Sequence, residues 1–461
     1  MKQRILLLLF IAFFCNAHAQ DSSIFKLKDY KYRTPGYRAL ELSLNTSGGF
    51  QNIRYPNIND QGSHFELSPS SIQYYSVVST DRKQTTHSFG ITPYYYGDKN
   101  KDNDVKSWSR NIQSGLSWSM NNRYFNNGNN FFEWGNDLFN SFGQSRNKTP
   151  NTRSEYNYNS LRNNFYLGFG RGRIENVQDA QMALFIINDL EHHGLLNKLA
   201  EGKTINDFAK LLTDLNNRRI FDFRRRRIFE LTQIDNFLRE KGLVTVTDIR
   251  HFTIINDNWA LAFNPFRRSG TNWYVRMQAQ GGYDYTFQDT KSVNNYTVEN
   301  RYPFLELGPK LGFEKYVPVS LKWQKNMGAS ITGFWINSRN RSESIYNGTV
   351  NNLARDTFQF FRTGLSVYYG VGYFPNNRTI LTAEINLSSF NDWGDDNNPQ
   401  KYLSALRPAF LMNADYFLGY RTRLQANLNL FYEKRYEKDL KLLDGRIING
   451  SFSISLKHTI F

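Results

Sequence analysis

Residues 273–286 read WYVRMQAQGGYDYT, an alternation of apolar and polar side chains that decides the fold. Successive side chains of a β-strand point to opposite faces, so Trp273 and Val275 share one face while Arg276 and Gln278 share the other. Residues 381–388 (LTAEINLS) and 423–432 (RLQANLNLFY) repeat the pattern. Such strands fit a transmembrane β-barrel, whose wall has lipid on one side and water on the other. A soluble β-sandwich also alternates, because one face of each sheet is buried.

The beginning of the chain favours the membrane. Lys2 and Arg4 precede an apolar run from 5 to 14, and residues 17–19 read AHA. This is the layout of a secretory signal peptide, so we expect a mature chain from Gln20. The run is too short for a membrane helix. The chain has one cysteine, Cys15, which we expect to be lost with the signal, leaving no disulfides.

The remaining sequence has no second apolar run of that kind, and the mean hydropathy of the whole chain is −0.60. A barrel explains this value, because only every second wall residue must be apolar. We therefore predict an all-β transmembrane antiparallel β-barrel of about 14 strands with an α-helical insertion. The expected strands are 38–47, 64–79, 85–96, 106–120, 129–142, 160–172, 271–287, 301–315, 318–336, 357–373, 379–390, 403–415, 420–434 and 447–460.

The expected loops alternate in length. Residues 81–84, 316–317, 374–378 and 416–419 form short turns, which are typical of the periplasmic end of such barrels. Residues 49–62, 144–159, 337–356, 391–402 and 435–446 are longer and richer in Asn, Asp and Gly. This alternation predicts an outer-membrane protein with periplasmic termini. The terminal Phe461 is out of phase with Phe452 and Ile454, which a β-bulge near Lys457 would correct.

Residues 176–262 carry a helical pattern instead. Met182 to Leu190 have helical spacing, with Gly194 as a C-cap; Thr204 and Asp207 resemble a capping box. Further helices are expected up to Gly242 and over 247–259. The predicted domains are a signal peptide (1–19), barrel strands 1–6 (20–175), a helical periplasmic or plug-like insertion (176–262) and barrel strands 7–14 (263–461).

The third helix is strongly basic. Its arginines have two interpretations: they cover a solvated face and pack their stems on apolar surface, or they form a docking patch for lipid headgroups, a carboxylate-lined pore or an acidic partner. The candidates are Arg218, Arg219, Arg224, Arg225, Arg226 and Arg227.

The formal charge of +16 also favours acidic or anionic partners. For an exported protein we expect outer-membrane lipid and lipopolysaccharide as partners, together with a periplasmic protein, and no nucleic acid.

The sequence does not favour an enzyme. Its histidines show no metal-binding spacing, and His87 and Ser88 point to opposite faces of a strand, so they cannot form a catalytic pair directly. Residues 202–204 (GKT) resemble the end of a phosphate-binding loop, but Asn197 stands where the first glycine is required. A lipid-modifying barrel enzyme stays the least favoured alternative, because no nucleophile, base and orienting group stand together.

We expect no cofactor, with calcium as an alternative. Oxygen-bearing side chains stand at every second position of an expected external loop, as at the start of a calcium-binding loop. These are Asp98, Asn100, Asp102 and Asp104. Asn103 replaces the turn glycine, so a solvated acidic turn competes with this interpretation. Asp392 belongs to another expected outer loop.

Polar residues of the strands should line the lumen, which in a barrel of this size is wide enough for small solutes. The lumen-facing candidates are Arg276, Gln278, Gln280, Asp284, Glu306, Lys310, Glu384, Arg423 and Gln425.

The alternating strands, the signal and the loop layout together resemble Gram-negative outer-membrane β-barrel proteins. The Tyr- and Asn-rich strands with an Arg-rich helical insertion resemble poorly characterised barrels of the Bacteroidota type. The resemblance implies a channel or a component of a transport system, with the insertion as its gate or docking module. The alternative is a structural or assembly anchor that binds a periplasmic partner.

Overall fold

The structure is a computed structural model that describes residues 25–31, 36–55, 58–102, 105–126, 128–149, 151–217, 223–245, 248–259, 267–293, 295–394, 403–419, 421–437 and 445–460. The side chains of residues 45–70, 96–109, 223, 224 and 437 are not described. The expected signal peptide and Phe461 lie outside these ranges.

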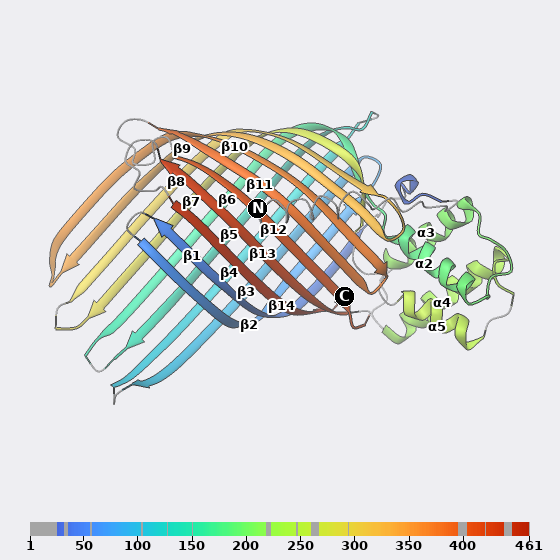
Figure 1. Ribbon diagram of the computed structural model, residues 1–461, viewed down its shortest axis with the longest axis horizontal. Helices are drawn as coiled ribbons and strands as arrows, with labels where there is room; N and C mark the ends of the chain where they lie inside the picture. The colour runs from blue at the N-terminus through green and yellow to red at the C-terminus, as the bar shows by residue number, and fades with distance from the viewer. Residues whose placement is uncertain are drawn as a thin grey trace, which may run out of the picture.

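Fourteen antiparallel strands close into a barrel, as predicted (Figure 1). Each strand pairs with its neighbours in the chain, and β1 pairs with β14 to complete the wall. The strands are β1 (Tyr37–Tyr55), β2 (Ile58–Ser79), β3 (Lys83–Asp102), β4 (Val105–Phe125), β5 (Asn130–Lys148), β6 (Arg153–Asn176), β7 (Arg268–Lys291), β8 (Tyr296–Pro318), β9 (Trp323–Tyr346), β10 (Thr349–Asn376), β11 (Thr379–Gly394), β12 (Leu403–Phe417), β13 (Thr422–Glu437) and β14 (Gly445–Thr459).

Three of the predicted long loops, 49–62, 144–159 and 337–356, are wrong for most of their length, because the strands continue through them. The expected loop 337–356 is paired β9 and β10 joined at Asn347-Gly348, where both residues have positive φ. Such a two-residue turn matches the twist of a hairpin. Residues 49–55 and 144–148 are likewise strand. Beyond the bilayer both faces of a strand are wet, so the alternation ends although backbone pairing continues.

The closing seam corrects a second prediction. The register of β14 runs without a shift from Arg446 to His458 against both neighbours, so the bulge expected near Lys457 is absent. The irregularity lies in β1 instead, between Ser43 and Asn45.

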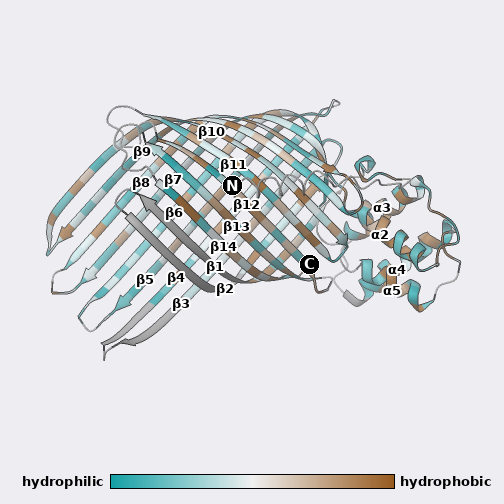
Figure 2. Cartoon of the chain, viewed as in Figure 1, coloured by the Kyte–Doolittle hydropathy of each residue, from teal (hydrophilic) through white to brown (hydrophobic). Residues whose placement is uncertain are grey.

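The outer wall carries the apolar side chains, and Figure 2 shows apolar and polar residues alternating along the strands. On β7, Trp273 and Met277 are 50% and 59% exposed although they lie in mid-strand. A surface of this kind is stable only against lipid, which makes the fold a transmembrane barrel.

The insertion forms four helices: α2 (Gln178–His192), α3 (Gly202–Asn217), α4 (Phe223–Glu240) and α5 (Ile249–Trp259). Gly194 and Gly242, just after α2 and α4, have φ of +66° and +65°, as their predicted capping roles require. The capping box at Thr204 is wrong, because α3 already begins at Gly202.

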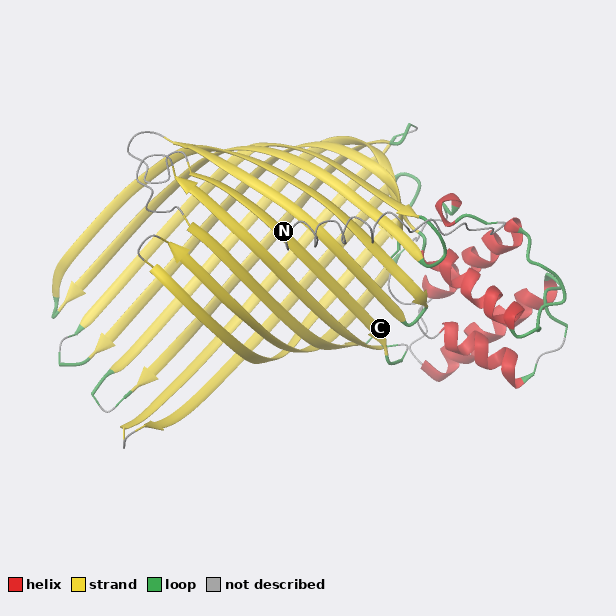
Figure 3. Cartoon of the chain, viewed as in Figure 1, coloured by secondary structure: helices red, strands yellow, loops and turns green. Residues whose placement is uncertain are grey.

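The helices pack as one block beyond the strands, at the end of the barrel where the C-terminus lies (Figures 1 and 3). Its core is apolar and includes Met182, Phe208, Leu212 and Ile234, all fully buried. The short helix η1 (Leu27–Asp29), ahead of β1, contributes to this core. The helices therefore lie beyond the strands, and the choice between a periplasmic and a plug-like role for the insertion stays a prediction.

Candidate functional site: the barrel interior and its mouth

The interior face is recognised by its buried polar residues. Glu133 of β5 and Asp415 of β12 are at most 1% exposed in mid-strand, although a charged side chain on the outer wall would be bare. Residues directly opposite one another in an antiparallel pair share a face. Glu133 lies opposite Gly168, which lies opposite Arg276, so Arg276 is interior.

The same register reasoning places the other eight lumen-facing candidates on the interior face. Lys310 lies opposite Arg276, Glu306 opposite Gln280, and Gln425 opposite Asp415. That these residues contact a solute remains a prediction. The partners of the rest are Tyr166 for Gln278, Asn164 for Gln280, Ser160 for Asp284, Gly370 for Glu384 and Phe417 for Arg423.

Glu133 is the centre of the strongest interior cluster. Its Oε2 accepts hydrogen bonds from Arg123 Nε at 2.9 Å and from Arg276 Nη2 at 3.0 Å. The rings of Tyr166 and Tyr274 lie 4.5 Å and 3.9 Å from the Arg276 guanidinium. The Glu133 cluster, meaning these five residues, therefore joins β4, β5, β6 and β7 across the interior. A carboxylate and two guanidiniums held this way form a rigid charged cluster on one side of the interior wall.

Other predicted residues also enter ion pairs. Arg423 contacts Glu41 at 3.1 Å, a pair that spans β14 and fastens the seam. Asp284 lies 3.5 Å from Arg162. The interior thus carries both signs of charge in paired form.

Sequence reasoning missed most of these partners. Glu133, Arg123 and Arg362 were not recognised, and Asp392 was assigned to an outer loop. That assignment is wrong: Asp392 belongs to β11, is 1% exposed and accepts from Arg362 Nε at 2.7 Å. The signal was present, because Asp392 keeps the period-2 phase of Glu384 along the strand.

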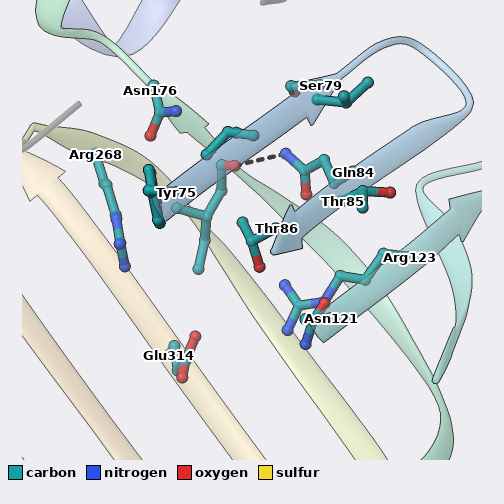
Figure 4. Close-up of a pocket in the computed structure, with 13 residues that line it drawn as sticks. Tyr75, Ser79, Gln84, Thr85, Thr86, Asn121, Arg123, Asn176, Arg268 and Glu314 are labelled. Carbon is teal, nitrogen blue, oxygen red and sulfur yellow. Dashed lines mark hydrogen bonds between the residues drawn. The ribbon is translucent and has the colours of Figure 1, made fainter. Parts of the chain in front are cut away.

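A pocket of about 240 Å³ opens inside the barrel at the helical end (Figure 4). Gln84 Nε2 bridges it by donating to the Ile174 carbonyl at 2.9 Å. Arg268, exposed and 5.6 Å above the Tyr316 ring, brings a positive charge to the pocket, and Glu314 brings a negative one. The lining also includes Tyr75, Val77, Ser79, Thr86, Asn121, Arg123 and Asn176.

The helical block is tied to several turns of this mouth. Asn377, in the β10–β11 turn, donates to Asn258 Oδ1 at 2.7 Å, and Arg378 pairs with Asp257. Leu321, in the β8–β9 turn, packs against the helical core. Arg267, just before β7, donates to the Trp323 carbonyl at 3.0 Å.

The end of β6 contacts a different turn, the one between β2 and β3. Arg173 donates to the carbonyls of Thr80 and Asp81 at 2.6 Å and 3.0 Å. The backbone at this end of β6 and β7 needs glycine at two positions. Gly172 and Gly270 have φ of +101° and +125°, and a Cβ there would lie 2.1 Å from a backbone oxygen.

The basic helix divides into three parts. Arg218 and Arg219, and the side chain of Arg224, lie outside the described residues. Arg226 pairs with Glu230 at 2.6 Å, and Arg227 donates to the Asn256 carbonyl at 2.6 Å, so these two support the helix packing. Arg225 is exposed. A docking role for the patch stays a prediction.

Two titratable groups lie inside the helical block. Burial raises the pKa of Asp179 to about 6, although Thr213 and Asn216 donate to its carboxylate. Burial also lowers the pKa of His251, against the opposing effect of its hydrogen bond to Asp235. Both shifts favour the neutral form.

Metal binding finds no support in the part of the chain that is described, where no group of three His, Cys, Asp or Glu could hold an ion. The side chains of Asp98, Asn100 and Asp102, and all of Asp104, lie outside that part. The backbone of 98–102 is strand paired with β4, so the external loop of the calcium hypothesis is wrong. Among the described helices none is both long and apolar enough to cross a bilayer.

The closed wall, apolar outer face and charged interior define the class: a transmembrane β-barrel protein with a helical block at one mouth. No protein-family model and no curated protein sequence matches the chain. Among solved structures it is similar to the Pseudomonas putida toluene transporter TodX (10% identity, 92% of this chain and 89% of that chain, TM-score 0.35). It is also similar to the translocator domain of autotransporter NalP from Neisseria meningitidis (8%, 94% and 90%, 0.30) and to a Pseudomonas aeruginosa FadL homologue (9%, 92% and 90%, 0.30). Likenesses this distant leave the function open.

Proposed function

We propose that this protein is an outer-membrane channel, acting alone or as part of an uptake or export system, whose helical block is a lid at the periplasmic mouth. The apolar outer wall supports a membrane location. The long hairpins at one end and the helices with the C-terminus at the other support periplasmic termini, because short turns mark that end of such barrels.

The interior supports passage of polar rather than apolar solutes. Its charges are paired in the Glu133 cluster and between Arg362 and Asp392, so no single sign dominates. The mouth pocket adds Arg268 and Glu314, two charges without an ion pair among the described residues. A small solute carrying both a positive and a negative group would find a partner for each.

The single observation that carries the lid role is the set of attachments around the mouth. The block receives the η1 segment and contacts the β8–β9 and β10–β11 turns. The pocket starts where the helices join the barrel, at Asn176 of β6 and Arg268 of β7, and extends from there to β2, β3 and β4 on one flank and to Glu314 of β8 on the other. A lid held at one side of the mouth would leave a route at the other.

Single-channel recording in planar bilayers tests the proposal. We would compare the full chain, a variant in which residues 178–259 are replaced by a short Gly-Ser linker, and an Asn377→Ala, Arg378→Ala double variant. We expect the deletion to raise the conductance and the double variant to add openings of that larger size. A full chain and a deletion variant that are both silent would contradict the channel; equal conductance of the three would contradict the lid.

The second candidate function is an anchor for a periplasmic partner. The observation that favours it is the exposed apolar side chains of the helical block, with Ile249 at 80%, Leu199 at 65% and Ile228 at 59% exposed. An Ile228→Ser, Ile249→Ser variant should lose a partner that co-purifies with the full chain, while its conductance stays unchanged. Absence of any such partner would remove this candidate.

A further inference from the structure

A polar patch interrupts the lipid-facing wall on β5 and β6. It consists of Asn136 and Asn140 on β5 and Asn163 on β6, with Leu138 at its centre. Leu138 lies opposite Trp118 on one side and Asn163 on the other. Phe132, four residues before Asn136, is exposed on the same face, whereas Glu133 and Asp137 face the interior.

The patch lies within the apolar band. From Phe132 to Phe142, both exposed, β5 runs for about eleven residues, which is the length that crosses the hydrocarbon core. Asn136 and Asn140 fall between these two ends. On β8 the corresponding outward positions are apolar, as at Leu305, Leu307 and Leu311. The asparagines are therefore an exception to the wall around them.

Hydrocarbon offers these amides no partner. The Oδ1 of Asn140 is buried without a hydrogen-bond partner among the described residues, and Asn163 is exposed. A polar group in this state is costly in lipid, where no water replaces the missing bond. Asn163 is exposed and Asn136 is half-buried, so another protein surface that brings donors and acceptors to the same depth would satisfy their amides.

We propose that this polar patch is the contact surface for a second copy of the chain. Two copies in one membrane share their orientation, so a two-fold axis along the membrane normal brings each depth of the patch against itself. A charged patch would repel its own copy. An amide both donates and accepts, so the amides of one copy can hydrogen-bond to amides at the same depth on the other copy.

The neighbouring residues fit a close approach of two walls. Gly281 lies opposite Asn163 and Ala279 opposite Phe165, so the outer face of β7 carries small residues next to the patch. Small residues around hydrogen-bonding side chains are what membrane-embedded contacts use. The described outer face of this region carries no charge between Phe132 and Phe142.

Cysteine crosslinking in native outer membranes tests the contact. On a Cys15→Ser background, Leu138→Cys places one thiol at the centre of the patch, and Ile385→Cys places a matched thiol on β11. Under mild oxidation we expect a dimer band at least tenfold stronger for Leu138→Cys. Equal yields at the two positions would overturn the proposal.

Removal of the amides gives an independent measurement. The triple variant Asn136→Leu, Asn140→Leu, Asn163→Leu should insert and fold, because it restores an apolar wall. Native mass spectrometry of the unmodified chain in lipid nanodiscs should show dimers, and the triple variant only monomers. A monomeric unmodified chain, an unchanged dimer in the triple variant, or a different protein or a lipid lost in place of the second copy would each overturn it.

Discussion

The barrel and the helical block bury opposite kinds of side chain. The helical block encloses mainly apolar residues such as Phe208 and Leu212, with few charged groups such as Glu230 buried among them. The barrel turns its apolar residues outward, with Met277 more than half exposed, and encloses Glu133 with two arginines. The difference shows that the solvent outside each region, water or lipid, decides which side chains are enclosed. We therefore expect apolar burial to stabilise the helical block and ion pairs to stabilise the interior of the barrel.

The largest expected effect comes from the interior of the barrel. Glu133→Ala leaves Arg123 and Arg276 buried without their carboxylate, and breaking such a group costs about 3–5 kcal/mol. Urea unfolding followed by tryptophan fluorescence measures it. Glu384→Ala, at an interior carboxylate with no ion pair among the described residues, is the control. Equal effects of the two variants would mean that the ion pairs do not stabilise the barrel.

A substitution in the helical core should separate the two regions. Leu212→Ala opens a cavity in a fully buried site, at a cost of about 2–5 kcal/mol. Because the barrel does not share that core, we expect the helices to become protease-sensitive while the strands stay folded. Proteolysis combined with gel migration of the unheated barrel measures both. Loss of the barrel together with the helices would show that the two regions fold as one.

The two faces of the wall should respond differently to the same charge. Leu365→Arg puts a cation on the lipid face of β10, where an arginine near the bilayer midplane costs about 2–4 kcal/mol. Thr382→Arg puts it on the interior face of β11, beside Glu384, with little cost. Unfolding midpoints of the two variants provide the comparison, and a reversed order would contradict our assignment of the faces.

The smallest effect is a pH dependence of the helical block. The pKa of Asp179 is about 6 in the folded state against an ordinary 3.8, so the folded state binds the proton more tightly. This stabilisation is present below about pH 4 and is lost as the pH rises through 6, by at most about 3 kcal/mol before the opposing effect of His251. His251, whose pKa is lowered, acts in the opposite direction by destabilising the block in acid. The difference between the unmodified chain and Asp179→Asn isolates the Asp179 contribution; an unchanged pH profile would remove it.

The sequence predicted the strands of the barrel wall better than the contacts between side chains in the barrel interior. Period-2 alternation is a local property, so residues 273–286 predicted their strand and its two faces directly. Partners such as Glu133 on β5 and Arg276 on β7 are 143 positions apart and meet only because a single strand, β6, lies between their strands in the closed sheet. The hairpin ends were missed for a related reason: outside the bilayer both faces are polar, and only backbone pairing identifies a strand there.

The sequence by itself determined that this chain forms an antiparallel barrel with an apolar outside and a helical insertion, because alternation and helical spacing depend on near neighbours. Only the tertiary structure decided that the helices lie at the mouth instead of inside the barrel, that Arg226 and Arg227 support packing, and that three asparagines share one patch of the lipid face. Each of these depends on register or docking, which bring together residues that are distant in sequence.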